Sequence, residues 1–131
     1  MRLLPALALA LIGGAGHAQT FMTADEYEAF STGQTLDYAI DGSVYGAERH
    51  LPGRKTLDAD LGEPCTEGLW FPEGDAICFM YDGSDDTHCW HFWREGDQVL
   101  AKPVGEDPGA APREVTVSPT QMSCPGPDVG V

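Results

Sequence analysis

Four cysteines constrain the fold of this 131-residue chain more than any other feature of its sequence. They are Cys65, Cys78, Cys89 and Cys124. An even number of cysteines in a small exported domain predicts two disulfides, because such domains are too small to be held by a hydrophobic core alone. Four cysteines allow three pairings, and the local sequence favours one of them.

A predicted hairpin between the second and third cysteines selects the pairing. The segment 82–85, Asp-Gly-Ser-Asp, suits a tight turn and lies between two runs of apolar and aromatic residues. A turn centred in this segment places Cys78 directly opposite Cys89. A four-residue loop makes them a non-hydrogen-bonded pair with Cα atoms about 4.5 Å apart, whereas a two-residue loop keeps the partners at a hydrogen-bonded position. We predict a Cys78–Cys89 bridge and, by elimination, a Cys65–Cys124 bridge.

The first 18 residues have the organisation of a secretory signal peptide. Arg2 precedes an apolar run that is too short to span a bilayer, and small residues at Gly16 and Ala18 suit cleavage after Ala18. We expect residues 1–18 to be removed and residues 19–131 to form a single domain. The expected product is periplasmic or secreted, has no membrane span, and works where disulfides persist.

The charge of the chain limits its partners. Arg2 is the only one of the seven basic residues within the first 18, and all 21 acidic residues follow it, so the remaining chain has a formal charge of -15. Such a charge repels phosphate backbones and anionic membranes, which makes nucleic-acid binding the least expected function. Cationic partners remain electrostatically favoured, although acidity also serves solubility alone.

Residue patterns predict a short helix followed by strands. Thr23 and Glu26 form a capping box, and Gly33 can end the helix after two or three turns. The apolar period then changes to two, and turn signals separate short runs. Strands are expected at 35–41, 56–61, 68–71, 76–81, 89–94, 99–102 and 114–117. The pattern predicts a mainly β fold: a small antiparallel meander or barrel-like sheet, with the helix covering one end or edge.

The segment 87–93, Thr-His-Cys-Trp-His-Phe-Trp, has the composition of a metal or redox site. Successive side chains on a strand point to opposite faces, so His88 and His91 cannot chelate one ion. We therefore predict no metal site and no cofactor there. The exposed acids of the neighbouring turn lack the ligand pattern of an EF-hand and indicate a solvated loop.

The same alternation sorts the hairpin residues between two faces. The face expected in the core collects Ile77, Phe79, Tyr81, His88, Trp90 and Phe92. The opposite face carries the predicted bridge and three candidate contact residues, Met80, His91 and Trp93. This second face is either covered by the helix or left as a patch for a partner.

No catalytic motif is present in the sequence. Neither a Gly-x-Ser-x-Gly nucleophile motif nor a Cys-x-x-Cys redox motif occurs. We therefore assign no catalytic residue and predict that the chain is not an enzyme.

Several short motifs together resemble a group of small exported alphaproteobacterial proteins of unknown function. They are Met-Thr-Ala-Asp-Glu-Tyr-Glu-Ala-Phe from Met22, Cys-x4-Trp from Cys65, Ile-Cys-Phe-x-Tyr from Ile77, Cys-Trp-x-Phe from Cys89 and Cys-Pro-Gly-Pro from Cys124. The resemblance extends from Met22 to Val131. It implies a bacterial periplasmic or secreted location and transfers no activity or site residue.

These observations predict a non-enzymatic binding or interaction protein whose partner, a protein or a small ligand, is unidentified. An alternative is an inhibitor or sequestering protein for a basic secreted enzyme such as a lysozyme, because opposite charges speed encounter. A third possibility is a metal-binding or small-ligand-binding protein. Ligand carriage is less expected because side chains can fill the interior of so small a barrel.

Overall fold

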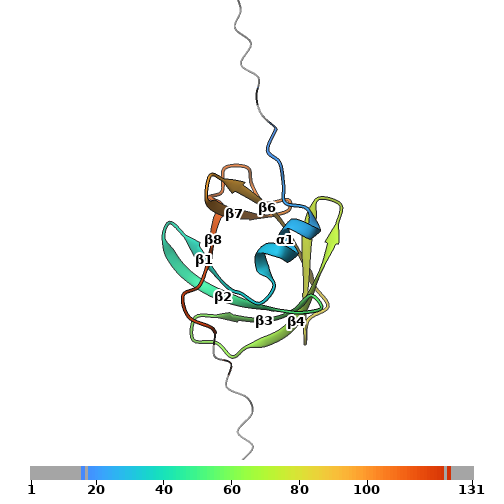
Figure 1. The fold of residues 1–131 in the computed structure, drawn as a ribbon, viewed down its shortest axis with the longest axis vertical. Coiled ribbons are helices and arrows are strands. Elements are labelled where there is room, and N and C mark those ends of the chain that lie inside the picture. The colour runs from blue at the N-terminus through green and yellow to red at the C-terminus, as the bar shows by residue number, and fades with distance from the viewer. Residues whose placement is uncertain (1–15, 17, 123, 125–131) are drawn as a thin grey trace, which may run out of the picture.

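The structure, a computed structural model, is a closed antiparallel β-barrel with one short helix (Figure 1). It describes residue 16, residues 18–122 and residue 124, so the predicted signal peptide lies almost wholly outside the described residues. The elements are α1 (Ala24–Ser31), β1 (Thr35–Ile40), β2 (Ser43–Leu51), β3 (Lys55–Asp60), β4 (Thr66–Glu73), β5 (Ala76–Tyr81), β6 (Thr87–Glu95), β7 (Gln98–Pro103) and β8 (Arg113–Val117). The mainly β, antiparallel fold class with an N-terminal helix is confirmed.

Each strand pairs with the next one in the chain, and β8 returns to pair with β1. Closure leaves no unpaired sheet edge, because every strand has a neighbour on both sides. Antiparallel pairing of consecutive strands needs only short connections, which the glycine-containing turns supply. Within the described residues, no helix is long and apolar enough to cross a membrane.

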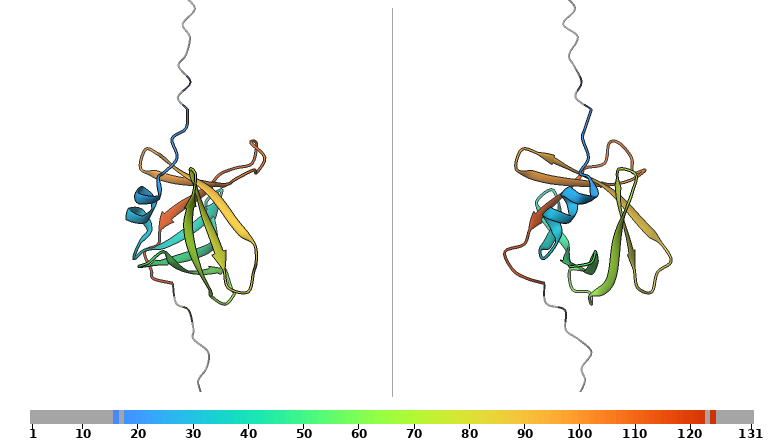
Figure 2. Two further views of the ribbon diagram at one scale, coloured as in Figure 1. Left: turned by 90° about the vertical axis from the view of Figure 1, so that its right-hand side faces the viewer. Right: turned by 45° about the vertical axis from the view of Figure 1, so that its right-hand side comes forward.

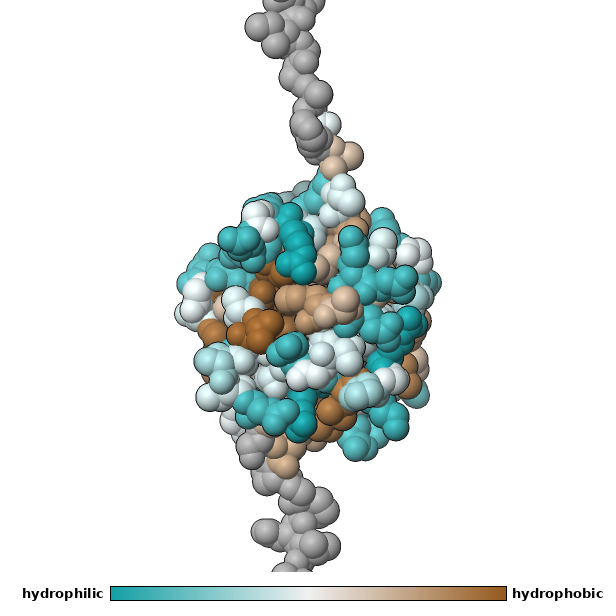
Figure 3. Space-filling view, viewed as in Figure 1, coloured by the Kyte–Doolittle hydropathy of each residue, from teal (hydrophilic) through white to brown (hydrophobic). Residues whose placement is uncertain are grey.

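The helix covers one end of the barrel (Figures 1 and 2). Its capping box forms as predicted, with the Thr23 hydroxyl accepting from the Glu26 amide at 3.2 Å and the Glu26 carboxylate accepting from the Thr23 amide at 2.8 Å. Glu28 pairs with Arg54 in the turn between β2 and β3 at 3.3 Å. In the space-filling view of this end, hydrophilic residues divide the hydrophobic surface into separate patches (Figure 3).

Tyr27 on α1 fills the barrel interior beneath the helix. Its side chain is fully buried, and its ring meets the rings of Phe92, Trp70 and Phe79 at centroid distances of 4.6, 5.1 and 6.3 Å. Buried aromatic side chains of this size dominate core energetics. The helix therefore closes its end of the barrel by inserting a tyrosine into a core of aromatic residues.

Both predicted disulfides are present. Cys78 bridges Cys89 with Cα atoms 4.0 Å apart, and the predicted register holds, since the two cysteines are direct partners of β5 and β6. Cys65 bridges Cys124 with Cα atoms 5.5 Å apart. The second bridge fastens the segment after β8 to the loop before β4.

Strand β2 was not predicted, and its burial pattern explains why. Its buried positions are Gly46, Glu48 and His50, so the side chains that face inward are small or polar. On β3, Thr56 is likewise buried, whereas Leu61 just beyond the strand is 70% exposed. A strand such as β2 can be recognised from alternating apolar residues only when the residues that face inward are apolar. Part of the barrel interior is therefore polar.

Candidate ligand-binding cavity

A cavity of about 370 Å³ occupies the half of the barrel away from the helix. It is lined by Tyr38, Tyr45, Gly46, Glu48, Asp58, Asp60, Phe79, Tyr81, His88, Trp90 and Phe92. The helix lies at the end that carries the β2–β3 turn, whereas Tyr45, Asp60 and His88 stand where β2 begins, β3 ends and β6 begins. In an antiparallel barrel these positions lie at the opposite end, so the cavity opens there.

One wall of the cavity is acidic. Glu48 on β2 and Asp58 on β3 are direct cross-strand partners, and Asp60 follows two residues later on the same face. Among the described residues, neither Asp58 nor Asp60 has a Lys, Arg or His ion-pair partner within 4 Å. Three carboxyl groups thus converge where the protein supplies little compensating charge.

Glu48 is the most deeply buried of the three acids, with 1% of its surface exposed. The hydroxyl of Tyr81 donates to its carboxyl group at 2.7 Å and that of Tyr38 at 3.4 Å. Burial raises the pKa of Glu48 to about 8, against the opposing effect of these hydrogen bonds. At neutral pH this carboxyl is therefore mainly protonated, and the tyrosines hold it in one orientation.

His50 connects the acidic wall to the helix. Its Nε2 atom lies 2.8 Å from the Tyr27 hydroxyl oxygen and 3.3 Å from Glu48 Oε1. Burial lowers the pKa of His50 to about 4, so the ring is neutral at physiological pH. Nδ1 has no hydrogen-bond partner among the described residues, which favours the tautomer with its proton on Nε2.

Asp58 is less buried than Glu48 and differs from it in charge. Burial, and after it the neighbouring Asp60, raises the pKa of Asp58 to about 6, while His88 acts in the opposite direction. Asp58 is therefore mainly ionised at pH 7. The acidic wall combines a neutral, fixed carboxyl at Glu48 with a charged and less buried one at Asp58.

The other wall is aromatic and comes from β5 and β6. Phe79, Tyr81, Trp90 and Phe92 line it, and the rings of Phe79 and Tyr81 are nearly parallel with centroids 6.3 Å apart. Gly68 on β4 makes room for Tyr81, since a Cβ atom at Gly68 would stand 2.6 Å from Tyr81 Cδ1. A glycine in this position is what allows Tyr81 to reach Glu48.

Arg113 is the basic residue next to the cavity, and it already has a partner. Its guanidinium donates two hydrogen bonds to the carboxylate of Glu106, at 2.6 and 2.8 Å. The same group lies 5.5 Å from the centroid of the Trp90 ring. Such a bidentate pair fixes the guanidinium and neutralises its charge. Arg113 therefore does not compensate Asp58 and Asp60.

The three predicted contact residues differ in exposure. Met80 is 38% exposed on the outside of β5, whereas Trp93 on β6 is only 7% exposed. Phe21 covers the latter region: its ring stacks on His91 with centroids 4.0 Å apart, and its backbone bridges to Trp93. This face was expected to be either covered by the helix or left open for a partner. Trp93 is covered, and the residue that covers it is Phe21 rather than the helix.

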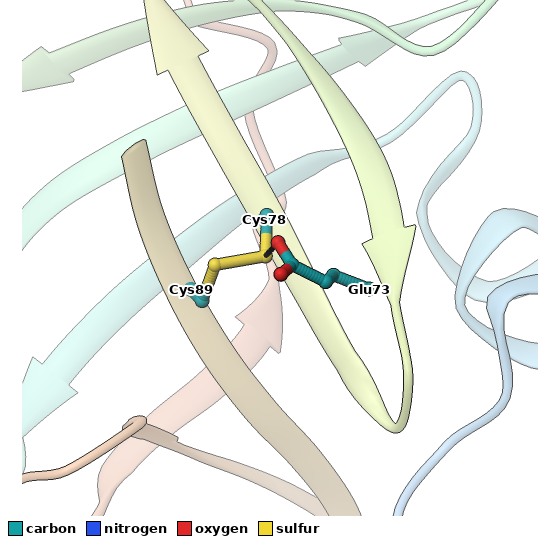
Figure 4. A group of neighbouring side chains, drawn as sticks. All are labelled: Glu73, Cys78 and Cys89. Carbon is teal, nitrogen blue, oxygen red and sulfur yellow. Dashed lines mark hydrogen bonds between the residues drawn. A yellow bond between two sulfur atoms is a disulfide. The ribbon is translucent and has the colours of Figure 1, made fainter. Parts of the chain in front are cut away.

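His88 and His91 lie on opposite faces of β6, as strand alternation requires. His88 lines the cavity, and His91 lies outside it with Nε2 3.0 Å from Asp75 Oδ1. A separate group of possible metal ligands is formed by Glu73 with Cys78 and Cys89 (Figure 4). Both sulfur atoms belong to the disulfide, so neither is a thiolate that could bind a metal ion.

The sequence correctly predicts His88, Trp90 and Phe92 on the inner face, but it does not reveal the acidic wall. The available signal was a polar alternation, Glu48 with His50 on one strand and Asp58 with Asp60 on the next. Period-two polar residues also occur on the solvent face of ordinary strands, so the pattern alone does not say which side is buried.

Comparison with known proteins found no match of any kind. No family model, no curated protein and no solved structure matches this chain.

Proposed function

We propose that this chain is an exported bacterial binding protein, without enzymatic activity, that holds a small molecule in the open half of its barrel. The observation that carries the proposal is the cavity of about 370 Å³ with an acidic and an aromatic wall. Its volume falls within the range of about 300–1,000 Å³ typical of small-ligand sites. The two disulfides support an oxidising, extracytoplasmic location.

The chemistry of the lining supports a functional cavity over a packing defect. Burying a carboxyl such as Glu48 costs free energy, and apolar side chains at the same positions would fill the space more favourably. Residues that lower the stability of a fold are expected at functional sites. The expectation that side chains fill the interior holds only for the half beneath the helix, where Tyr27 is inserted.

Native mass spectrometry of protein purified from its own host tests this function. We expect a small-molecule adduct on the wild-type chain and a reduced adduct on the His88→Trp variant, because an indole at position 88 narrows the mouth. Thr87→Trp is the matched control, since Thr87 is an exposed neighbour on the outer face of the same strand. Absence of an adduct, or an adduct unaffected by His88→Trp, would refute the proposal.

A second candidate function is sequestration of a basic secreted protein. It is favoured by the acidity of the chain and by Asp82, Asp85 and Asp86, which are exposed in the β5–β6 loop at the open end of the barrel. Electrostatic association of this kind weakens as salt screens the charges. Binding to a basic protein such as a lysozyme should therefore fall strongly between low and high salt, and salt-independent binding would exclude this function.

A further inference from the structure

We infer that the ligand of this cavity is a small organic cation, with its ammonium group against Asp58 and Asp60 and its apolar body against Tyr81 and Trp90. The inference rests on the proposed function and adds to it the chemical class of the ligand.

The charge of the acidic wall is not balanced by a nearby basic side chain. Asp58 and Asp60 follow each other on the same face of β3, and no described basic side chain pairs with either. His88 also lines the cavity and acts against the rise in the pKa of Asp58, but it has no ion pair within 4 Å with either aspartate. A ligand cation would supply the missing counter-charge, whereas an anionic ligand would be repelled.

The arginine next to the cavity is held by an acidic partner. The guanidinium of Arg113 is the group that could attract an anionic ligand, and it donates both of its short hydrogen bonds to Glu106. Freeing it would require breaking a bidentate pair, which is among the stronger polar contacts in proteins. Among the described residues, no lysine or arginine lines the cavity, and the charge of Arg113 is already paired with Glu106.

The opposite wall of the cavity suits the apolar part of an organic cation. Phe79, Tyr81 and Trp90 present aromatic rings across the cavity from the carboxylates. Aromatic faces attract cations and also accept apolar groups. A cavity of about 370 Å³ is far larger than one metal ion, and the aromatic wall supplies no metal ligand apart from a hydroxyl. An organic ammonium fits both walls.

A pair of probes of equal shape tests this class of ligand. Benzylammonium and benzyl alcohol differ in charge and share the same ring, and NMR can follow the indole N–H signals of the three tryptophans. Trp90 lines the cavity, and Trp93 lies outside it under Phe21, so Trp93 is an internal control. We expect benzylammonium to shift Trp90 but not Trp93, and to bind at least about tenfold more tightly than benzyl alcohol.

The Asp58→Asn variant isolates the role of the charge. It should abolish most of the preference for benzylammonium while leaving the binding of benzyl alcohol unchanged. Asp97→Asn removes the same charge from an exposed residue in the β6–β7 turn, at the end away from the mouth, and should keep the preference. If both probes shift Trp90 with equal affinity, or if Asp58→Asn keeps the preference, the ligand class is wrong although the cavity still binds small molecules. If neither probe shifts Trp90, the inference is overturned, and the native adduct decides the proposed function independently.

Discussion

The two halves of the barrel are built by the same eight strands and differ in what faces inward. Beneath the helix, Tyr27, Trp70 and Phe92 pack as a dense aromatic core. At the other end, Glu48 and Asp58 occupy equivalent inward positions and face a cavity. A closed barrel satisfies its backbone hydrogen bonds along the whole length of its strands. One half can therefore supply stability while the other keeps polar groups for binding.

The largest expected effect is on the free energy of unfolding. It appears when two tyrosines, one at each end of the barrel, are replaced and compared. Tyr27→Ala should lower the free energy of unfolding by about 4 kcal/mol, because it removes a fully buried aromatic ring from a packed core. Tyr45→Ala at the mouth should cost less than about 1 kcal/mol, since Tyr45 is exposed. Urea denaturation measures both values. Equal losses for the two variants would mean that the halves do not differ in packing.

A smaller effect concerns the pH dependence of stability. The folded protein holds the proton of Glu48 up to about pH 8, whereas the unfolded chain releases it near the ordinary value of 4.5. The folded form then binds more protons, so stability decreases as pH rises. Between pH 6.5 and 8 the loss should be about 2 kcal/mol, and calorimetry should show a falling melting temperature.

His50 affects the stability of the fold mainly below this pH window. Its folded pKa of about 4 lies below its ordinary value of 6.5, so it destabilises the fold only as pH falls below 6.5 and opposes Glu48 there. The other groups that face Glu48 are Tyr38, Tyr81 and Asp58, and the pKa of Asp58, about 6, lies below the window. Glu48→Gln should remove the slope between pH 6.5 and 8. The same slope in that variant would assign it to another group.

The smallest effect lies on the surface of the helix-covered end. Glu28→Gln breaks an ion pair with Arg54 in which both side chains are partly exposed. Such pairs contribute about 0.5 kcal/mol or less. The variant should shift the urea midpoint slightly and leave the pH slope of Glu48 intact. A loss above about 2 kcal/mol would show that this contact contributes far more than a partly exposed ion pair should.

The sequence predicted most of the strands, and it gave the correct inner face where the inward residues are apolar. Strand β3 was predicted too, although its inward residues Thr56, Asp58 and Asp60 are polar. In the β5–β6 hairpin, the turn chemistry and the alternation of Phe79 with Cys78 were enough to give the register and the bridge. The elimination step then paired Cys65 with Cys124. Local patterns succeed here because the hydrophobic period and the turn both indicate the same register.

The candidate site escaped prediction because its residues contradict the usual pattern. Glu48 and Asp58 are acids that face inward, and period-two acids normally indicate a solvent face. The cover of Trp93 by Phe21 also depends on a contact between residues 72 positions apart in the chain. Closure of the barrel, which only tertiary pairing of β1 with β8 determines, is what places the acidic wall inside.

A high-resolution crystal structure of the protein grown with benzylammonium tests the central claim most directly. We expect open space in the half of the barrel bounded by Asp58, Tyr81 and Trp90, with the ammonium beside the carboxylate. We also expect Tyr27 to fill the helix-covered half. A structure in which Trp90 or Tyr45 folds inward and leaves no room for a ligand would contradict the account.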